Sequence, residues 1–328
     1  MDESAAAKVI TELTLGHLAP RCLHVIAEFG IADALGDQPA SAGELAARTG
    51  INADALGRAL RLLAAHGVFA HGPDGYTHTP ASRLLASDHP QSLRAYARMV
   101  GMPALWNGVA NLAHATRTGR PATDWAALVA YFADHPDEAS LFNQAMAGKS
   151  AVVVPAVLDA YDFGGFHRIA DIGGGRAHLV RAILGREPAA SGILFELPHV
   201  VADAAALGSA RLDLVAGDFF NDALPVADCY ILMEVIHDWA DSEATAILAA
   251  VQRAAPSHAR VLIVETLVSE EPGPQWGKVL DLVMLAVTGG RERTPSEYGA
   301  LLAAAGLRFE RVIPTHSAYS IVEAVVAR

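Results

Sequence analysis

His237 and Asp238 follow directly after an apolar run, residues 229–236. A run of this kind is typical of a buried strand, which would place His237 where the strand ends. Neutral imidazole has a reference pKa of about 6.5 and can remove a proton from a phenol or enol hydroxyl. Two interpretations of His237 follow from this position: a general base facing a site, or a polar residue that only caps the next helix.

A glycine turn, Gly173 to Gly175, lies between a strand pattern and a helical pattern. Glycines let the backbone turn sharply and let a ligand approach the start of the helix without obstruction by a Cβ atom. The dinucleotide fingerprint GxGxxG would need a glycine at position 178, where His178 stands. The turn therefore favours a ligand other than a nicotinamide dinucleotide.

Two acidic positions follow the glycine turn at the ends of the next two predicted strands. Glu196 stands about 23 residues beyond Gly173, where a carboxylate can accept both hydroxyls of a ribose. Asp218 and Phe219 follow the third strand and suit the amine and the flat face of an adenine. Three such features in order, at the carboxyl ends of three successive strands, indicate a nucleoside site.

The elements that must position these residues alternate between strands and helices from about residue 151 onward. This alternation predicts an α/β, doubly wound, Rossmann-like sheet that is mostly parallel, with helices on both faces. The last two strands are separated by a short gap, so we expect that pair to be antiparallel. The predicted strands cover residues 167–172, 192–197, 212–217, 229–235, 259–268, 308–314 and 319–326.

Residues 1–95 predict a separate, α-helical domain. Two short helical patterns meet at Thr49 and Gly50, with Asn52 or Asp54 as the cap of the second, and two short strands follow around the turn 73–75. Helix-turn-helix followed by a hairpin is a winged-helix pattern. This domain has seven lysines and arginines against ten acidic residues, so we expect it to serve homodimer formation rather than DNA binding. Residues 96–328 would then hold a helical linker and the sheet.

The composition narrows the classes of partner. The 328-residue chain has a formal net charge of −12, which disfavours binding to nucleic acid or to an anionic membrane. Neither a signal peptide nor an apolar run of about 18 residues is evident, so we expect a cytoplasmic protein. The two cysteines, Cys22 and Cys229, lie in separate apolar contexts and predict neither a metal site nor a disulfide.

With these motifs in place, the chain resembles the S-adenosylmethionine-dependent O-methyltransferases of the caffeate, hydroxyindole and antibiotic-tailoring type. The N-terminal winged-helix pattern also looks like the dimerisation domain of that family, so the resemblance covers nearly the whole chain. The matching stretches are DIGGG (171–175), FELPHVV (195–201), GDFF (217–220), HDWAD (237–241), VLIVETLV (261–268) and GGRERT (289–294).

The resemblance implies a role for each matched position in binding S-adenosyl-L-methionine. It places the methionine part of the cofactor near Gly173 and Gly175, the ribose on Glu196, and the adenine beside Leu197, Asp218 and Phe219. Two positions depart from the family pattern: Ala177 stands where many relatives have glycine, and Met233 where many have lysine or another polar residue. Because Met233 would cost a polar contact to the cofactor, we expect a lower cofactor affinity.

The resemblance also implies that His237 is the general base, flanked by Glu265 and Glu292. We expect Glu265, at the end of its strand, to hold the second imidazole nitrogen and stabilise the cation that forms. The acceptor would be a hydroxyl of a small aromatic or polyketide-like molecule. In relatives the linker helices supply the acceptor pocket, which here points to Trp106, Phe142, Asn143 and Met146.

Several alternatives remain open from the sequence. The same fold and cofactor site could serve a hydroxylation, a decarboxylation or a pericyclic step, and a DNA-binding regulator is a third possibility. Arg291 and Arg293 flank Glu292 and are most simply members of salt bridges. Trp239 either borders the adenine or packs in the core.

Overall fold

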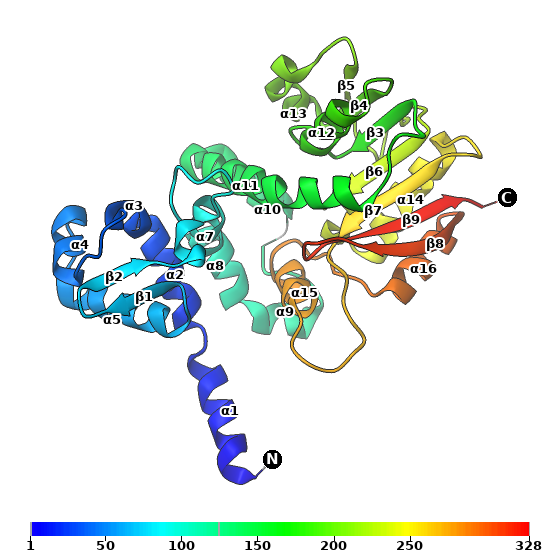
Figure 1. The fold of residues 1–328 in the computed structure, drawn as a ribbon. Coiled ribbons are helices and arrows are strands. Elements are labelled where there is room, and N and C mark those ends of the chain that lie inside the picture. Colours follow the sequence, from blue (N-terminus) through cyan, green and yellow to red (C-terminus); the bar gives the residue numbers. More distant parts are fainter. Residues whose placement is uncertain (1, 124, 328) are drawn as a thin grey trace. The chain divides into compact units, whose positions relative to one another are not determined.

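The computed structural model describes residues 2–123 and 125–327, and the chain forms two compact units (Figure 1). The first unit comprises Met1–Asn107 and Ala130–Lys149, and the second comprises Gly108–Val129 and Ser150–Arg328. Three helices run from one unit into the other: α8 (Pro103–Ala110), α10 (Trp125–Asp134) and α11 (Pro136–Ala160). By length and composition alone, α11 could cross a membrane, and 39% of its most apolar window is buried within the structure.

The first unit contains the two helices and the hairpin that the sequence predicts. Ser41 caps α4 in a reciprocal capping box with Glu44, and Asn52 caps α5. Strands β1 and β2 pair antiparallel around the turn at Asp74. The elements are α1 (Glu3–Leu15), α2 (Leu18–Glu28), α3 (Ile31–Leu35), α4 (Ala42–Thr49), α5 (Ala53–Ala65), β1 (Phe69–Gly72), β2 (Gly75–His78), α6 (Pro80–Arg83) and α7 (Arg94–Gly101).

Helices α2 to α5 and the hairpin share one apolar core. Leu45, Leu56, Leu60 and Leu63 are buried in it, because they recur at helical spacing on the inner faces of α4 and α5. Helix α1 differs from the others, since none of its residues is buried. Its apolar side chains Val9, Ile10 and Leu13 are exposed.

The second unit is built on a seven-stranded sheet with the order β5-β4-β3-β6-β7-β9-β8 (Figure 1). Strands β3 to β7 are parallel to one another, whereas β9 is antiparallel to both β7 and β8. The predicted doubly wound sheet with an antiparallel last pair is therefore confirmed. The strands are β3 (Arg168–Ile172), β4 (Ser191–Glu196), β5 (Leu212–Ala216), β6 (Cys229–Met233), β7 (Arg260–Glu265), β8 (Leu307–Pro314) and β9 (Ser320–Val326).

Helices cover both faces of this sheet. On one face, α14 (Asp241–Ala254) and α16 (Pro295–Ala304) pack against the inward side chains of β3, β6, β7 and β9. On the other face, the end of α11 and α12 (His178–Arg186) pack against the alternate side chains of the same strands. Nearly every residue of the central strands is therefore apolar, as expected for parallel strands buried on both faces. The remaining elements are α9 (Leu112–Thr118), α13 (Pro198–Asp203), α15 (Trp276–Val287) and the 3-10 turns η1 (Ala205–Leu207) and η2 (Ile236–Asp238).

Candidate active site

The carboxyl ends of β3 to β7 meet at one edge of the sheet in the second unit. Chain order reverses between β3 and β6, which are neighbours in the sheet, so this edge carries the crevice where open α/β folds bind their ligands. Gly173 follows β3, Glu196 ends β4, and Glu265 ends β7. The fold therefore brings these predicted site residues to the same edge.

Two of the three glycines in the turn after β3, Gly173 and Gly174, have no room for a side chain. Gly173 and Gly175 adopt left-handed conformations with φ of 69° and 55°. A Cβ atom on Gly173 would lie 2.9 Å from a methyl carbon of Val235, and one on Gly174 would lie 2.3 Å from the carboxyl carbon of Asp171. The three glycines thus form a cradle of bare backbone at the start of α12, which suits close approach by a ligand.

Asp171 lies buried behind this cradle and is only 1% exposed. Its Oδ2 atom accepts a hydrogen bond from the Val180 amide at 3.4 Å, in the first turn of α12. Its Oδ1 atom has no hydrogen-bond partner within the described part of the chain. Burial, together with the nearby charge of Glu196, raises the pKa of Asp171 to about 7.

Ala177, at the N-cap of α12, has a left-handed backbone with φ of 57°. This is the position where the family pattern favours glycine, and the left-handed conformation gives the physical reason for that preference. The chain reaches the same turn with alanine, whose methyl group is fully buried.

Glu196 connects the end of β4 to the glycine turn. Its Oε1 atom accepts from the Gly175 amide at 3.1 Å, and its Oε2 atom accepts from the Leu197 amide at 2.7 Å. A carboxylate oxygen has a second lone pair, so both atoms can still accept hydroxyl donors. Leu197 is 43% exposed at this edge.

Asp218 and Phe219 lie just beyond β5, as predicted. The two oxygens of Asp218 accept from the Phe220 amide at 2.9 Å and the Asn221 side chain at 2.7 Å, which folds this loop back on itself. The Phe219 ring approaches to 3.9 Å from the position that a Cβ atom on Gly173 would occupy. Trp239 packs edge-on against Phe219 and Phe220, with ring centroids 5.9 and 4.8 Å apart, so it has a packing role.

His237 lies in the short turn η2, beyond the end of β6, and is only 5% exposed. Its Nδ1 atom is 2.7 Å from Oε1 of Glu292. Since a carboxylate can only accept, Nδ1 carries the proton and Nε2 is the atom available for other chemistry. The strand itself ends at Met233, three residues earlier than the apolar run indicates, because Glu234 turns the backbone away with φ of 57°.

The prediction that Glu265 holds the second imidazole nitrogen is wrong. Glu265 accepts instead from the backbone amide of His237 at 2.9 Å, and its other oxygen accepts from the hydroxyl of Tyr298. Glu292 holds the ring. The reason is that Glu265 ends β7, the strand next to β6, where its carboxylate reaches the backbone of η2. The loop before α16 brings Glu292 to the imidazole instead.

Burial and the neighbouring charges shift the pKa of His237 in opposite directions. Burial alone would lower the pKa of His237, but the neighbouring carboxylates raise it to about 10, chiefly those of Asp238 and Glu292. Asp238 contributes from 3.8 Å, measured from its Oδ1 atom to Nε2. Burial raises the pKa of Glu265 to about 7. The site therefore strongly stabilises the imidazolium form of His237, and Nε2 can accept a proton only in the neutral form of the ring.

Arg293 is a structural part of this site that could hardly be singled out from the sequence. It is 1% exposed and donates to the carbonyl oxygens of Ile236 at 3.2 Å and Trp239 at 2.9 Å, on both sides of His237. It also pairs with Asp241 at 2.8 Å, so its membership of a salt bridge is confirmed. The only signal in the sequence is its place next to Glu292.

The same loop closes over the backbone of His237. The amide of Arg291 donates to the His237 carbonyl oxygen at 2.8 Å, and the Arg291 side chain pairs with Glu297 at 2.6 Å, as the salt-bridge interpretation expects. A Cβ atom on Gly290 would lie 1.9 Å from the His237 carbonyl oxygen. Only glycine fits there. Loop 289–293 therefore fixes both the ring and the main chain of His237.

The predicted acceptor residues all belong to the first unit. Trp106 is half-buried in α8, with its ring edge-on to His24 at 5.6 Å. Phe142 and Met146 lie on α11 and pack against a buried cluster that includes Met99 and Leu141. Asn143 is exposed. Met233, the predicted cofactor residue at the end of β6, is half-buried in the second unit.

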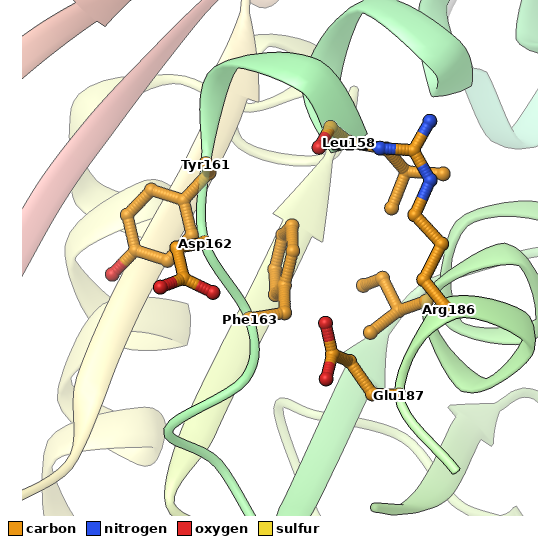
Figure 2. A pocket seen from close by; sticks show the side chains of 7 residues that line it. Leu158, Tyr161, Asp162, Phe163, Arg186 and Glu187 are labelled. Carbon is orange, nitrogen blue, oxygen red and sulfur yellow. Dashed lines mark hydrogen bonds between the residues drawn. The ribbon is translucent and has the colours of Figure 1, made fainter.

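A cavity of about 220 Å³ lies within the second unit (Figure 2). Its lining comes from the segment before β3 and from the end of α12, so it belongs to the amino edge of the sheet, opposite the glycine turn. Arg186 is engaged there with the Leu158 carbonyl oxygen and the Asp159 carboxylate. The cavity is lined by Leu158, Tyr161, Asp162, Phe163, Ile183, Arg186 and Glu187.

Comparison with known proteins accounts for this geometry. Residues 109–308 match the family model of the O-methyltransferase domain. The chain belongs to the O-methyltransferase family. The methyltransferase domain model includes all the site residues of the second unit, and residues 11–88 match the O-methyltransferase dimerisation domain.

Three relatives of this O-methyltransferase resemble it along nearly their whole length. A phenazine O-methyltransferase from Lysobacter antibioticus is 41% identical, over 97% of this chain and 96% of the relative. A methyltransferase of calicheamicin biosynthesis, solved in its SAH-bound form, is 34% identical with a TM-score of 0.91 and 100% coverage of both chains. An O-methyltransferase of neocarzinostatin biosynthesis, solved with S-adenosylmethionine and 2-hydroxy-5-methyl naphthoic acid, is 32% identical with a TM-score of 0.77, covering 94% of this chain and 96% of the other.

Proposed function

We propose that this O-methyltransferase transfers the methyl group of S-adenosyl-L-methionine to a hydroxyl of a small aromatic acceptor, with His237 as the general base. The observation that carries the proposal is the buried pair of His237 and Glu292, which leaves Nε2 available at the edge of the sheet that also holds the glycine cradle. A base and a nucleoside site at one sheet edge are what methyl transfer to a hydroxyl needs.

The residues at the glycine turn fit the cofactor. The bare backbone from Gly173 to Gly175 would receive the methionine part, next to the Oδ1 atom of Asp171, which has no hydrogen-bond partner among the described residues. Glu196 would hold the ribose, while Leu197, Asp218 and Phe219 would border the adenine. When bound, S-adenosylmethionine supplies an electrophilic methyl carbon on a sulfonium. The SAH-bound calicheamicin relative and the S-adenosylmethionine-bound neocarzinostatin relative support this assignment.

Met233 and Ala177 would modify cofactor binding without preventing it. Met233 offers a half-buried thioether at the end of β6, where it would border the cofactor without an ionic contact. Ala177 already adopts the left-handed backbone that a glycine would adopt more easily.

The residues around His237 would handle the proton of the acceptor. His237 would take this proton on Nε2, and the resulting imidazolium would be stabilised through Nδ1 by Glu292. Glu265 would act on the backbone amide of His237 rather than on the ring, and Arg293 would hold the carbonyl oxygens on either side. The protein's tasks are thus to remove a proton and to align the oxygen with the methyl group.

The relatives support the proposed class of acceptor. The names of the relatives specify a phenazine methyltransferase and a complex with a hydroxylated naphthoic acid, both built on planar aromatic rings. Trp106, Phe142 and Met146 would supply aromatic and apolar contacts for such a ring, and Asn143 would supply a polar one. We also propose that the protein forms a homodimer through the matched dimerisation segment. It would act in the cytoplasm and would bind neither nucleic acid nor a membrane.

The test is incubation of the purified protein with isotopically labelled S-adenosylmethionine and a panel of phenols, naphthols and hydroxylated phenazines. We expect the labelled methyl group to appear on the acceptor oxygen. We expect this labelling to be lost in the His237→Gln variant. Consumption of an acceptor without labelling would favour a non-methylating reaction on the same fold. A gel-shift control with duplex DNA covers the regulator alternative.

A further inference from the structure

Glu234 is one of two non-glycine residues with a left-handed backbone in residues 2–123 and 125–327, and the other is Ala177. Both lie at the carboxyl edge of the sheet, Ala177 just after the glycine turn and Glu234 just after β6. A left-handed conformation is disfavoured for residues that have a Cβ atom. Strained backbone of this kind persists where the surrounding structure enforces it, and it gathers at functional sites.

The surroundings hold Glu234 by both its main chain and its side chain. Its amide donates to the Val264 carbonyl oxygen at 3.1 Å. Its Oε1 atom accepts from the hydroxyl of Tyr319 at 2.6 Å. Tyr319 is itself buried and anchored, since its carbonyl oxygen accepts from the Thr315 hydroxyl at 2.7 Å.

The turn at Glu234 determines where the next three residues lie. Val235 is directed onto the glycine turn, with a methyl carbon 2.9 Å from where a Cβ atom on Gly173 would lie. Two residues later, the His237 amide reaches Glu265 and its ring reaches Glu292. The strained residue Glu234 therefore comes directly before Val235, which contacts the glycine cradle, and three residues before His237, the proposed base.

We propose that Glu234, held by Tyr319, is a positioning residue that fixes His237 in its place relative to the glycine cradle. Cofactor binding and proton removal would then both depend on the turn at Glu234. This inference rests on the proposed function. It assigns neither residue a contact with the substrate. It requires that loss of the Tyr319–Glu234 hydrogen bond affect catalysis more than it affects stability.

The chain contains a matched control pair. Tyr161 donates to Glu323 at 2.8 Å, which is also a tyrosine–glutamate hydrogen bond of the second unit. Glu323 pairs with Leu262 in the middle of β7, whereas Ser320, next to Tyr319, pairs with Glu265 at the carboxyl end. Tyr161→Phe therefore removes a comparable bond away from the site.

The experiment compares Tyr319→Phe, Glu234→Ala, Glu234→Gln, Glu234→Gly and Tyr161→Phe in the full-length protein. The readouts are melting temperature, affinity for S-adenosylhomocysteine, the NMR titration of His237, and turnover of the best phenol from the panel. Tyr319→Phe and Glu234→Ala should lower turnover by about 10- to 100-fold through misplacement of the base. They should weaken S-adenosylhomocysteine binding by about three- to tenfold. The pKa of His237 should fall toward its ordinary value in both variants.

The remaining variants separate positioning from stability. Glu234→Gln keeps an acceptor for Tyr319 and should retain near wild-type turnover. Glu234→Gly relieves the strain, so it should keep or raise the melting temperature while turnover falls. Tyr161→Phe should lower the melting temperature by roughly 2–4 °C and leave turnover unchanged.

Tyr319→Phe and Glu234→Gly variants with wild-type turnover and His237 titration would overturn this inference and leave the proposed function intact. A wild-type protein that binds no S-adenosylhomocysteine would instead overturn the proposed function, and this inference with it.

Discussion

Oε1 of Glu292 lies 2.7 Å from Nδ1 of His237, and both side chains are buried. The two residues are 55 positions apart in the sequence. This relationship fixes the tautomer of the imidazole, leaves Nε2 as its basic atom, and places a negative charge where the imidazolium would form.

Replacement of His237 by glutamine should lower turnover by about 10²–10⁴-fold, because glutamine keeps a hydrogen bond but cannot accept the acceptor's proton. Affinity for S-adenosylhomocysteine, measured by calorimetry, should hardly change, since the ring is assigned to the acceptor side. An acceptor phenol with a low pKa should be less affected, because it arrives already ionised. Near wild-type turnover on a weakly acidic phenol would rule out His237 as the base.

Glu292→Gln should move the pH profile to lower pH. The rate of the wild-type protein should rise with pH through the pKa of His237, which lies at about 10, since the base acts only when deprotonated. Glutamine removes the charge that helps to raise this pKa, so the rising limb should begin earlier. The plateau should also be lower, because the imidazolium loses its stabilising partner. A profile of kcat/KM between pH 6 and pH 10.5 checks both effects, and an unmoved limb would contradict the assignment.

The folding stability should also depend on pH through His237. Because its pKa is about 10 in the folded protein against 6.5 ordinarily, its stabilising contribution is complete below about pH 6.5. It is lost as the pH rises through 10. Urea unfolding at several pH values should show this decline in the wild type and a flatter curve in His237→Gln. Equal slopes in both proteins would count against a charged His237.

Asp171→Asn should stabilise the protein at neutral to alkaline pH. The pKa of Asp171 is about 7 in the folded protein against 3.8 ordinarily, so stability falls as the pH rises from about 4 to 7. Asparagine cannot ionise, and its amide oxygen can still accept from the Val180 amide. The gain in the free energy of unfolding at pH 8 should be roughly 2–4 kcal/mol. A variant that is less stable than wild type at pH 8 would contradict the argument.

Glu196→Ala should weaken S-adenosylhomocysteine binding by about 2–4 kcal/mol, the loss of two charge-assisted hydrogen bonds. Glu187→Ala is a matched control, because Glu187 lines the cavity at the opposite edge of the sheet. Calorimetry on both variants separates the ribose contact from a general effect of charge. Unchanged affinity in Glu196→Ala would remove this residue from the site.

The strand segments and their mostly parallel direction could be predicted because buried parallel strands are continuous apolar runs, and because glycine and acidic residues mark their ends. The end of β6 could not be predicted. Glu234 lies inside an apolar run, and its left-handed backbone is imposed by Tyr319 and Val264, which are distant in the sequence.

The partners of the base show the same limit. The sequence correctly places Glu265 at a strand end next to His237. It does not reveal whether the Glu265 carboxylate binds the ring or the backbone amide of His237. The position of Glu292 depends on loop 289–293, where Gly290 and Arg293 pack against the main chain of η2. Neither contact follows any periodicity in the sequence.

The division of the chain into two units has an evolutionary consequence. The residues proposed to recognise the acceptor lie in the first unit, whereas the glycine cradle, His237 and loop 289–293 lie in the second. Substitutions in α8 and in the first half of α11 could therefore change which molecule is methylated without altering the machinery that methylates it. These two helices are therefore the natural targets for laboratory redesign of the proposed acceptor range.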